Sequence, residues 1–291
     1  MSDPQHHHHQ QPGHDTEGVP DETAMAELLD LDAEVLHAYL SDVTNWVHER
    51  AGDRPCRRIV DVGSGTGAGA LALLQRFAES EVFALDTSEA LLTSVAAHAR
   101  ERGVADRIHP TQANLDDGWP EIGSVDLVWA SSSLHHMADP DRVLADVFAA
   151  LGSGGLLVVA EMDGFPTFLP DDIGIGVPGL EARCHAAAAR AHADVLPHLG
   201  SDWGTRIARA GFTVEAERSF SIDLTPPLPP ATGRYARAFL QLIRSHLEGR
   251  ISAEDTTTLD NLIHSDGPDG ILQRGDLTVR NTRTVWVGRR P

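Results

Sequence analysis

Short apolar runs alternate with longer segments of helical periodicity through the middle of the chain. The runs are strand-sized and nearly continuous, which is typical of parallel strands buried on both faces. Strands that alternate with helices predict an α/β fold with a doubly wound, Rossmann-like sheet and helices on both faces. The predicted strands are residues 58–62, 81–85, 107–113, 124–130 and 155–162, and the predicted helices are residues 68–79, 88–102 and 140–150.

A proline in the third apolar run indicates the order of the strands. Pro110 has no backbone N–H to give to a sheet, so its strand fits best at an edge. The doubly wound order 3-2-1-4-5 places the third strand at an edge. We therefore expect that order.

Helical caps and two more strands are predicted around this core. Apolar residues recur at helical spacing through residues 21–50, helices are expected near 181–196, 201–210, 234–248 and 253–264, and strands at 212–224 and 277–288. The long insertion between the last two strands suggests a cap over a site. We divide the chain into a disordered His-rich tail (1–20), an N-terminal helical cap (21–52), a cofactor-binding core (53–162), a second helical cap (163–200) and the rest of the sheet (201–291) with a helical insertion (230–265).

Composition and charge exclude several classes of partner. Acidic residues outnumber basic ones 43 to 23 and the formal net charge is −20, which disfavours nucleic acids and anionic membranes. All 23 basic residues are arginine, so chemistry that needs a neutral lysine is excluded. The first residues lack the apolar centre of a signal peptide and the two cysteines are isolated, so we expect a cytoplasmic protein.

A glycine-rich loop follows the first predicted strand in the segment RIVDVGSGTGAG, residues 58–69. Glycines between a strand and a helix let backbone amides approach a ligand closely. Gly63, Gly65 and Ala68 satisfy the loose dinucleotide pattern GxGxx(G/A), so a nicotinamide cofactor is one candidate. Asp61 argues against it, because a carboxylate there repels a diphosphate and attracts an ammonium or sulfonium group.

Further polar markers stand at the ends of the next strands. Asp86 ends the second strand, where an acidic side chain binds ribose hydroxyls in this fold. Asn114 ends the third, and its amide can pair with an adenine edge. The fourth strand runs into SSSLHHMADP (131–140), and a glycine turn, LGSGG, leads into the fifth.

Together, VDVGSGTG, LDTS, DLVWASSSLHHMADP and LGSGGLLVVAE resemble the class I S-adenosylmethionine-dependent methyltransferases, in particular the small-molecule branch with an LHH…DP loop. The resemblance covers about residues 57–161. It implies a mostly parallel seven-stranded sheet whose last strand is antiparallel, and S-adenosyl-L-methionine as cofactor. It also implies which residues contact the cofactor. Around the methionine part these are Asp61, Gly63, Ser64, Gly65, Thr66 and Gly67; at the ends of the second and third strands they are Asp86, Thr87, Asn114 and Leu115; and near the sulfonium it is Ser131.

The reaction expected of such a site is transfer of a methyl group to a small or medium organic acceptor. Orientation of the reactants supplies much of the rate, and a general base adds to it where the acceptor must lose a proton. His136 is our first candidate base, His135 the second and Glu161 the third, although the histidines could equally be packing residues. No pair of histidines has the HExxH spacing, so we predict no metal.

The acceptor is expected between the N-terminal helix, the segment 164–199 and the insertion after Pro230, where aromatic residues gather: Tyr39, Trp46, Phe165, Phe168, Tyr235 and Phe239. Ser131-Ser132-Ser133 differs from the Asn-Pro-Pro-Tyr segment of enzymes that methylate DNA bases, which further disfavours nucleic acid. We expect a monomer or homodimer. An NAD(P)-dependent oxidoreductase and a non-catalytic S-adenosylmethionine-binding regulator or partner subunit are the alternatives.

Overall fold

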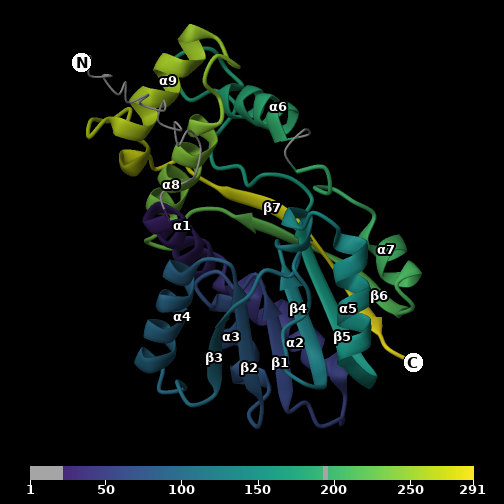
Figure 1. The fold of residues 1–291 in the computed structure, drawn as a ribbon. Coiled ribbons are helices and arrows are strands. Elements are labelled where there is room, and N and C mark those ends of the chain that lie inside the picture. The colour runs from purple at the N-terminus through teal and green to yellow at the C-terminus, as the bar shows by residue number, and fades with distance from the viewer. Residues whose placement is uncertain (1–21, 193–195) are drawn as a thin grey trace, which may run out of the picture.

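One seven-stranded sheet organises the protein. The computed structural model describes residues 22–192 and 196–291, so the predicted tail (1–20) lies outside the described residues. The strands are β1 (Arg58–Val62), β2 (Glu81–Asp86), β3 (Ile108–Gln112), β4 (Val125–Ser131), β5 (Leu151–Met162), β6 (Thr213–Leu224) and β7 (Val279–Arg289), in the order β3-β2-β1-β4-β5-β7-β6 (Figure 1). The predicted order 3-2-1-4-5 and the α/β fold class are confirmed, with Pro110 in the edge strand β3.

Strand direction follows from how the strands are connected. The pairs β1–β2, β1–β4, β2–β3 and β4–β5 are parallel, because a helix joins or crosses between each pair. β7 pairs antiparallel with both β5 and β6. The predicted antiparallel last strand is thus confirmed.

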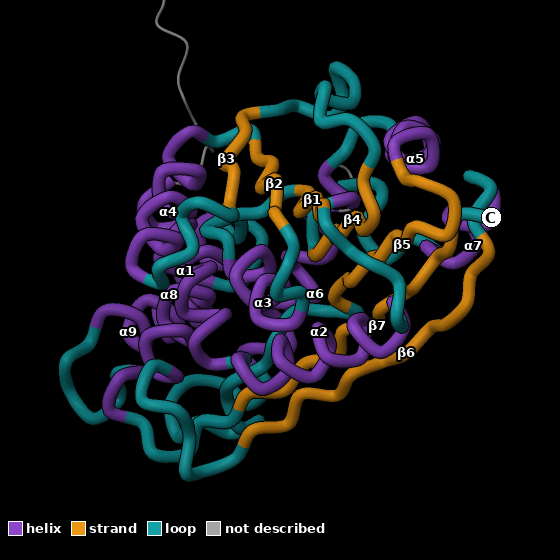
Figure 2. The backbone as a smooth tube through the Cα atoms, turned by 90° about the horizontal axis from the view of Figure 1, so that it is seen from below, coloured by secondary structure: helices purple, strands orange, loops and turns teal. Residues whose placement is uncertain are grey.

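Helices cover both faces of this sheet. On one face lie α2 (His37–Ala51) and α3 (Ala68–Arg76), and on the other lie α5 (Pro140–Ala150) and α7 (Trp203–Arg209) (Figure 2). α4 (Glu89–Glu101) packs beside β2 and β3. Because β-strand side chains alternate, successive residues of β1 enter different cores: Ile59 belongs to the first and Val60 to the second.

Three further helices form a cap at one end of the molecule: α6 (Leu180–His192), α8 (Thr232–Ser245) and α9 (Ala253–His264) (Figure 1). α1 (Glu22–Val35) packs against α8. The N-terminal helical pattern forms two helices, α1 and α2, which are divided at Leu36. Both helices bury apolar residues in the same core, so the apolar periodicity continues across the division. Short 3-10 helices occur at Leu134–His136 and Ile271–Gln273.

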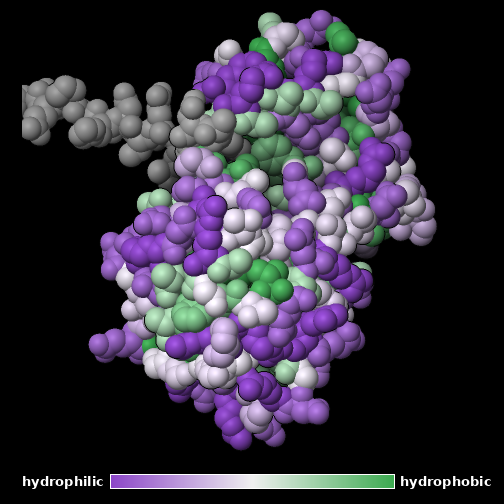
Figure 3. All heavy atoms as spheres, turned by 90° about the vertical axis from the view of Figure 1, so that its right-hand side faces the viewer, coloured by the Kyte–Doolittle hydropathy of each residue, from purple (hydrophilic) through white to green (hydrophobic). Residues whose placement is uncertain are grey.

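The surface is mainly polar. Hydrophilic residues dominate the face in Figure 3, where hydrophobic residues form small patches. Among the described residues, the large hydrophobic side chains classed as exposed are Val177 and Leu272. No helix in the described ranges is both long and apolar enough to cross a membrane.

Candidate active site

The end of β1 holds a buried carboxyl group. Asp61 is 2% exposed, and its Oδ2 has no hydrogen-bond partner among the described residues. Burial raises the pKa of Asp61 to about 7; the Ala70 backbone amide opposes this rise, and the charge of Asp86 adds to it. A buried carboxylate oxygen without a partner is costly, and a cationic ligand relieves that cost.

The glycine loop curves tightly beside Asp61. Gly63, Gly65 and Gly67 have φ angles of 64°, 55° and 89°, in the left-handed region that favours glycine. At Gly63 a Cβ atom would lie 2.5 Å from the Cβ of Ser133, so the loop packs closely on the end of β4.

Several amides of this loop already have partners within the protein. Ser64 N donates to the Leu85 carbonyl at 2.8 Å, Gly65 N to Asp86 Oδ2 at 2.9 Å and Gly67 N to the Ser64 carbonyl at 2.9 Å. A diphosphate needs amides that point at it without competing partners. These three bonds, together with the buried carboxyl group of Asp61, make the loop a poor cradle for a dinucleotide diphosphate.

Of the predicted ribose and adenine residues, Asp86 contacts the loop, whereas the side-chain hydrogen bonds of Asn114 are local. Besides Gly65 N, the carboxylate of Asp86 accepts from Ser88 N at 3.0 Å, so it shapes both the loop and the start of α4. Asn114 is exposed and engaged locally, accepting from Asp116 N at 3.1 Å and donating to Asp117 Oδ2 at 3.1 Å.

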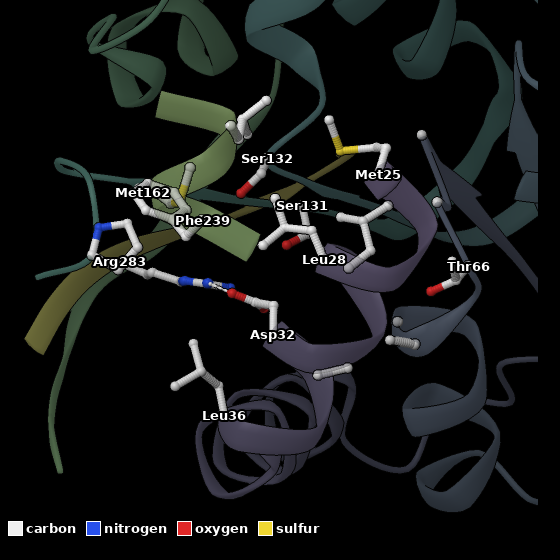
Figure 4. Close-up of a pocket in the computed structure, with 18 of the residues that line it drawn as sticks. Met25, Leu28, Asp32, Leu36, Thr66, Ser131, Ser132, Met162, Phe239 and Arg283 are labelled. Atoms are coloured by element: carbon white, nitrogen blue, oxygen red, sulfur yellow. Dashed lines mark hydrogen bonds and ion pairs between the residues drawn. The ribbon is translucent and has the colours of Figure 1, made fainter. Parts of the chain in front are cut away.

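A cavity of about 410 Å³ opens between the carboxyl ends of the strands, α1 and the cap. Figure 4 shows part of its wall, with Leu28, Asp32 and Leu36 along α1 and its end and Phe239 opposite. The predicted site residues that line it are Asp61, Gly63, Ser64, Gly65, Thr66, Ser131, His135 and His136. Those outside its lining are Gly67, Asp86, Thr87, Asn114, Leu115 and Glu161. The structure thus brings Asp61, the loop residues 63–66, Ser131 and both histidines to one cavity.

The two adjacent histidines differ in environment. His135 is 5% exposed and its Nδ1 lies 2.7 Å from Oε2 of Glu161, which is also 5% exposed. His136 is exposed at the cavity edge, with its ring 4.2 Å from that of His135 between centroids. A carboxylate fixes the orientation and tautomer of a histidine that it contacts. The orientation of His135 is therefore fixed in the way that a general base requires, although position along the sequence favoured His136 as the candidate.

Most of the aromatic residues predicted for an acceptor pocket also lie in this wall. Tyr39, Phe165, Tyr235 and Phe239 line the cavity, whereas Trp46 and Phe168 do not. Within residues 22–192 and 196–291, no group of three or more His, Cys, Asp or Glu side chains is placed to hold a metal ion.

The same wall holds a polar network that the sequence patterns did not predict. Asp32 Oδ1 accepts from Arg283 at 2.6 Å (Figure 4). The same oxygen accepts from the Tyr235 hydroxyl at 2.7 Å. The charge of Asp32, with Tyr39 and Tyr235, raises the pKa of Arg283 although burial alone lowers it. The available signals were a charged residue on the apolar side of a helix and an arginine inside the predicted strand 277–288.

Known proteins share the central part of the chain. Residues 60–157 match a family model described as a methyltransferase domain. The trans-aconitate 2-methyltransferase of Acidovorax sp. (strain JS42) is 37% identical over 107 residues, which are 37% of this chain and 39% of that protein. The malonyl-[acyl-carrier protein] O-methyltransferase of Laribacter hongkongensis is 32% identical over 165 residues, which are 53% of this chain and 50% of that protein. The chain thus spans at most half of these two relatives.

A solved structure extends the similarity to most of the fold. The crystal structure of a Bacillus halodurans C-125 protein described as a methyltransferase superposes with a TM-score of 0.54 at 17% identity, covering 85% of this chain and 98% of that one. At that identity the likeness concerns the fold alone. The family match, the sheet order and the glycine loop next to Asp61 agree with one another. Residues 60–157 are thus a methyltransferase domain, and its sheet order and glycine loop resemble those of the class I S-adenosylmethionine-dependent methyltransferases.

Proposed function

We propose that this protein transfers the methyl group of S-adenosylmethionine to a small or medium organic acceptor and releases S-adenosylhomocysteine. The observation that carries the proposal is the unpartnered Oδ2 of Asp61, buried at the end of β1 and facing the cavity. The cofactor has an ammonium group and a sulfonium group, and a buried carboxylate attracts both. The charge and burial of Asp61 therefore fit this cofactor.

Asp61 and the loop residues Gly63 to Thr66 would hold the methionine part, with Ser131 near the sulfur. Asp86 would contact the ribose from its place under the loop. When bound, the cofactor supplies a methyl group on positively charged sulfur, an electrophile that needs no further activation. The chain itself must position the acceptor and exclude water, and the apolar wall of α1 and α8 suits both tasks.

A proton on the acceptor would leave through His135. Nδ1–H of His135 would donate a hydrogen bond to Oε2 of Glu161, which leaves Nε2 unprotonated and able to take a proton from the acceptor. Glu161 is then a positioning residue, since it lies outside the cavity lining. His136, at the edge of the same cavity, is the second candidate base.

Titration calorimetry with S-adenosylhomocysteine and with NAD tests the cofactor. We expect saturable binding of the first and none of the second; the reverse result would remove the proposal. Acceptors are then found by mass spectrometry of methylated products. The panel includes organic acids, because the relatives are named for trans-aconitate and a malonyl carrier protein.

Once an acceptor is known, His135→Ala should lower kcat about 10²- to 10⁴-fold with an unchanged Kd for S-adenosylhomocysteine. Glu161→Gln should lower kcat less and shift its pH profile, which a purely structural role would not do. His264→Ala, at the exposed end of α9, is the matched control. Normal turnover in His135→Ala would reject the base, while leaving methyl transfer intact.

A further inference from the structure

Arg283 places a cation in a largely apolar wall. It lies in β7 opposite Met162 of β5, and it is the only arginine among the described residues that line the cavity of about 410 Å³ beside Asp61. The residue is 7% exposed. A long cationic side chain is rarely buried in this way without a partner, so its contacts indicate what the position is built for.

The contacts with other described residues leave part of the guanidinium without a hydrogen bond. Its hydrogen bond goes to Asp32 at 2.6 Å, and its Cζ lies 5.0 Å from the centre of the Tyr39 ring. Nε is buried and has no hydrogen-bond partner in the described part of the chain. A guanidinium has five N–H donors, arranged to bind a carboxylate through two of them.

We propose that Arg283 binds a carboxylate on the methyl acceptor, which is then an apolar organic acid. This inference rests on the proposed function and names the substrate class of the same site. The apolar wall that includes Leu28, Leu36 and Phe239 would contact the hydrocarbon part of the acid. A carboxylate here gains charge-assisted hydrogen bonds in a place shielded from water.

The sheet register separates this anchor from the site of methyl transfer. Ser131 of β4 pairs with Ala160 of β5, and Ala160 pairs with Val285, two residues from Arg283. With strands about 4.8 Å apart and about 3.3 Å per residue, the Cα atoms of Ser131 and Arg283 are about 12 Å apart. One medium-sized acceptor reaches both places. The carboxylate held by Arg283 is therefore a different group from the one that receives the methyl.

Asp32 offers the main rival role for this network. It could anchor an amine instead, or its ion pair could serve only to hold α1 and α8 against β7, since Tyr235 of α8 donates to the same oxygen. Asp32 Oδ1 already accepts two hydrogen bonds, whereas Arg283 Nε has none. This difference favours an acid as the ligand.

Octanoate, octanol and octylamine test the proposal, because they share one chain and differ in the charge of the head group. Calorimetry on the full chain, with and without S-adenosylhomocysteine, gives the three Kd values. We expect octanoate to bind at least about tenfold more tightly than octanol, about 1.4 kcal/mol, and octylamine more weakly than either. Equal binding of octanoate and octanol would overturn the proposal, and so would a preference for octylamine.

Two variants locate the effect. Arg283→Met should abolish the preference for octanoate and keep the Kd for S-adenosylhomocysteine, which also shows that it folds. Asp32→Asn should bind octanoate at least as tightly as the wild type, because it removes a competing carboxylate. Retained preference in Arg283→Met would refute the assignment. If Arg283→Met does not fold, the wild-type comparison and Asp32→Asn decide. If S-adenosylhomocysteine does not bind, the proposed function is contradicted. The comparison of octanoate with octanol would still test the role of Arg283.

Discussion

Replacing Asp61 by asparagine tests how a ligand-binding residue destabilises the protein that carries it. In the ligand-free protein the carboxyl group is 2% exposed, and burial raises its pKa to about 7. Asparagine has nearly the same shape, keeps an oxygen that can accept from the Ala70 amide, and has no charge to bury. The substitution therefore separates the charge from the packing.

The magnitude follows from the pKa. The folded state holds the proton more tightly than the unfolded state, whose pKa is near 3.8, so stability falls as the pH rises from about 4 to about 7. At 1.36 kcal/mol per pKa unit, the charged group destabilises the fold by at most about 4 kcal/mol at pH 8. Asp61→Asn should recover much of this at pH 8, and progressively less as the pH falls toward 4.

Cofactor binding should change in the opposite direction. A hydrogen bond to a charged group contributes about 1.5–3 kcal/mol, so the Kd for S-adenosylhomocysteine should rise about 10- to 150-fold in Asp61→Asn. The variant is expected to be the more stable protein and the weaker binder.

Urea unfolding at pH 8 and pH 5.5 without ligand, together with calorimetry, measures both quantities. Asp223→Asn, at an exposed position in β6, serves as the control and should change neither. If Asp61→Asn is less stable than the wild type at pH 8, the carboxyl group is not a buried uncompensated charge. If its Kd is unchanged, the ligand does not use this carboxylate.

Other substitutions probe the loop and Glu181, another buried acid. Gly63→Ala should destabilise more than Gly103→Ala. Both glycines have a positive φ, 64° and 67°, which costs about 1–2 kcal/mol with a side chain. The new Cβ lies 2.5 Å from the Cβ of Ser133 at Gly63 and meets nothing within 4 Å at Gly103. Equal urea midpoints would contradict this. Burial raises the pKa of Glu181 to about 7 as well. Because Asp61 and Glu181 both take up a proton in this range, ligand-free stability should rise by roughly 1–2 kcal/mol when the pH is lowered from 8 to 6.5, and the double variant Asp61→Asn/Glu181→Gln should lose that dependence. A wild-type urea midpoint that falls over this range would oppose the prediction. Asp86→Ala frees the loop and should weaken S-adenosylhomocysteine binding more than it lowers the urea midpoint; unchanged affinity would show that the loop holds its shape alone.

Much of the sheet could be predicted because its strands are buried on both faces and read as continuous apolar runs. Residues 58–62 form β1 as predicted, and 81–85 differs from β2 by one residue. β5 begins at Leu151, four residues earlier than predicted, because its first part carries the LGSGG turn and bends away from the apolar pattern. The N-terminal pattern did not reveal the division at Leu36, since a bend between two helices that pack on one core leaves the periodicity intact.

The sequence by itself determined the fold class, the strand order and the kind of ligand at the end of β1. These follow from local patterns: apolar periodicity, a proline at an edge, and a carboxylate beside glycines. Tertiary structure alone decided which polar groups meet. Asp32 and Arg283 are 251 positions apart in the chain and 2.6 Å apart in space, and Glu161 pairs with His135 instead of His136. Hydrogen bonds and charge pairs depend on distances of a few ångströms and on burial, and neither is a function of separation along the chain.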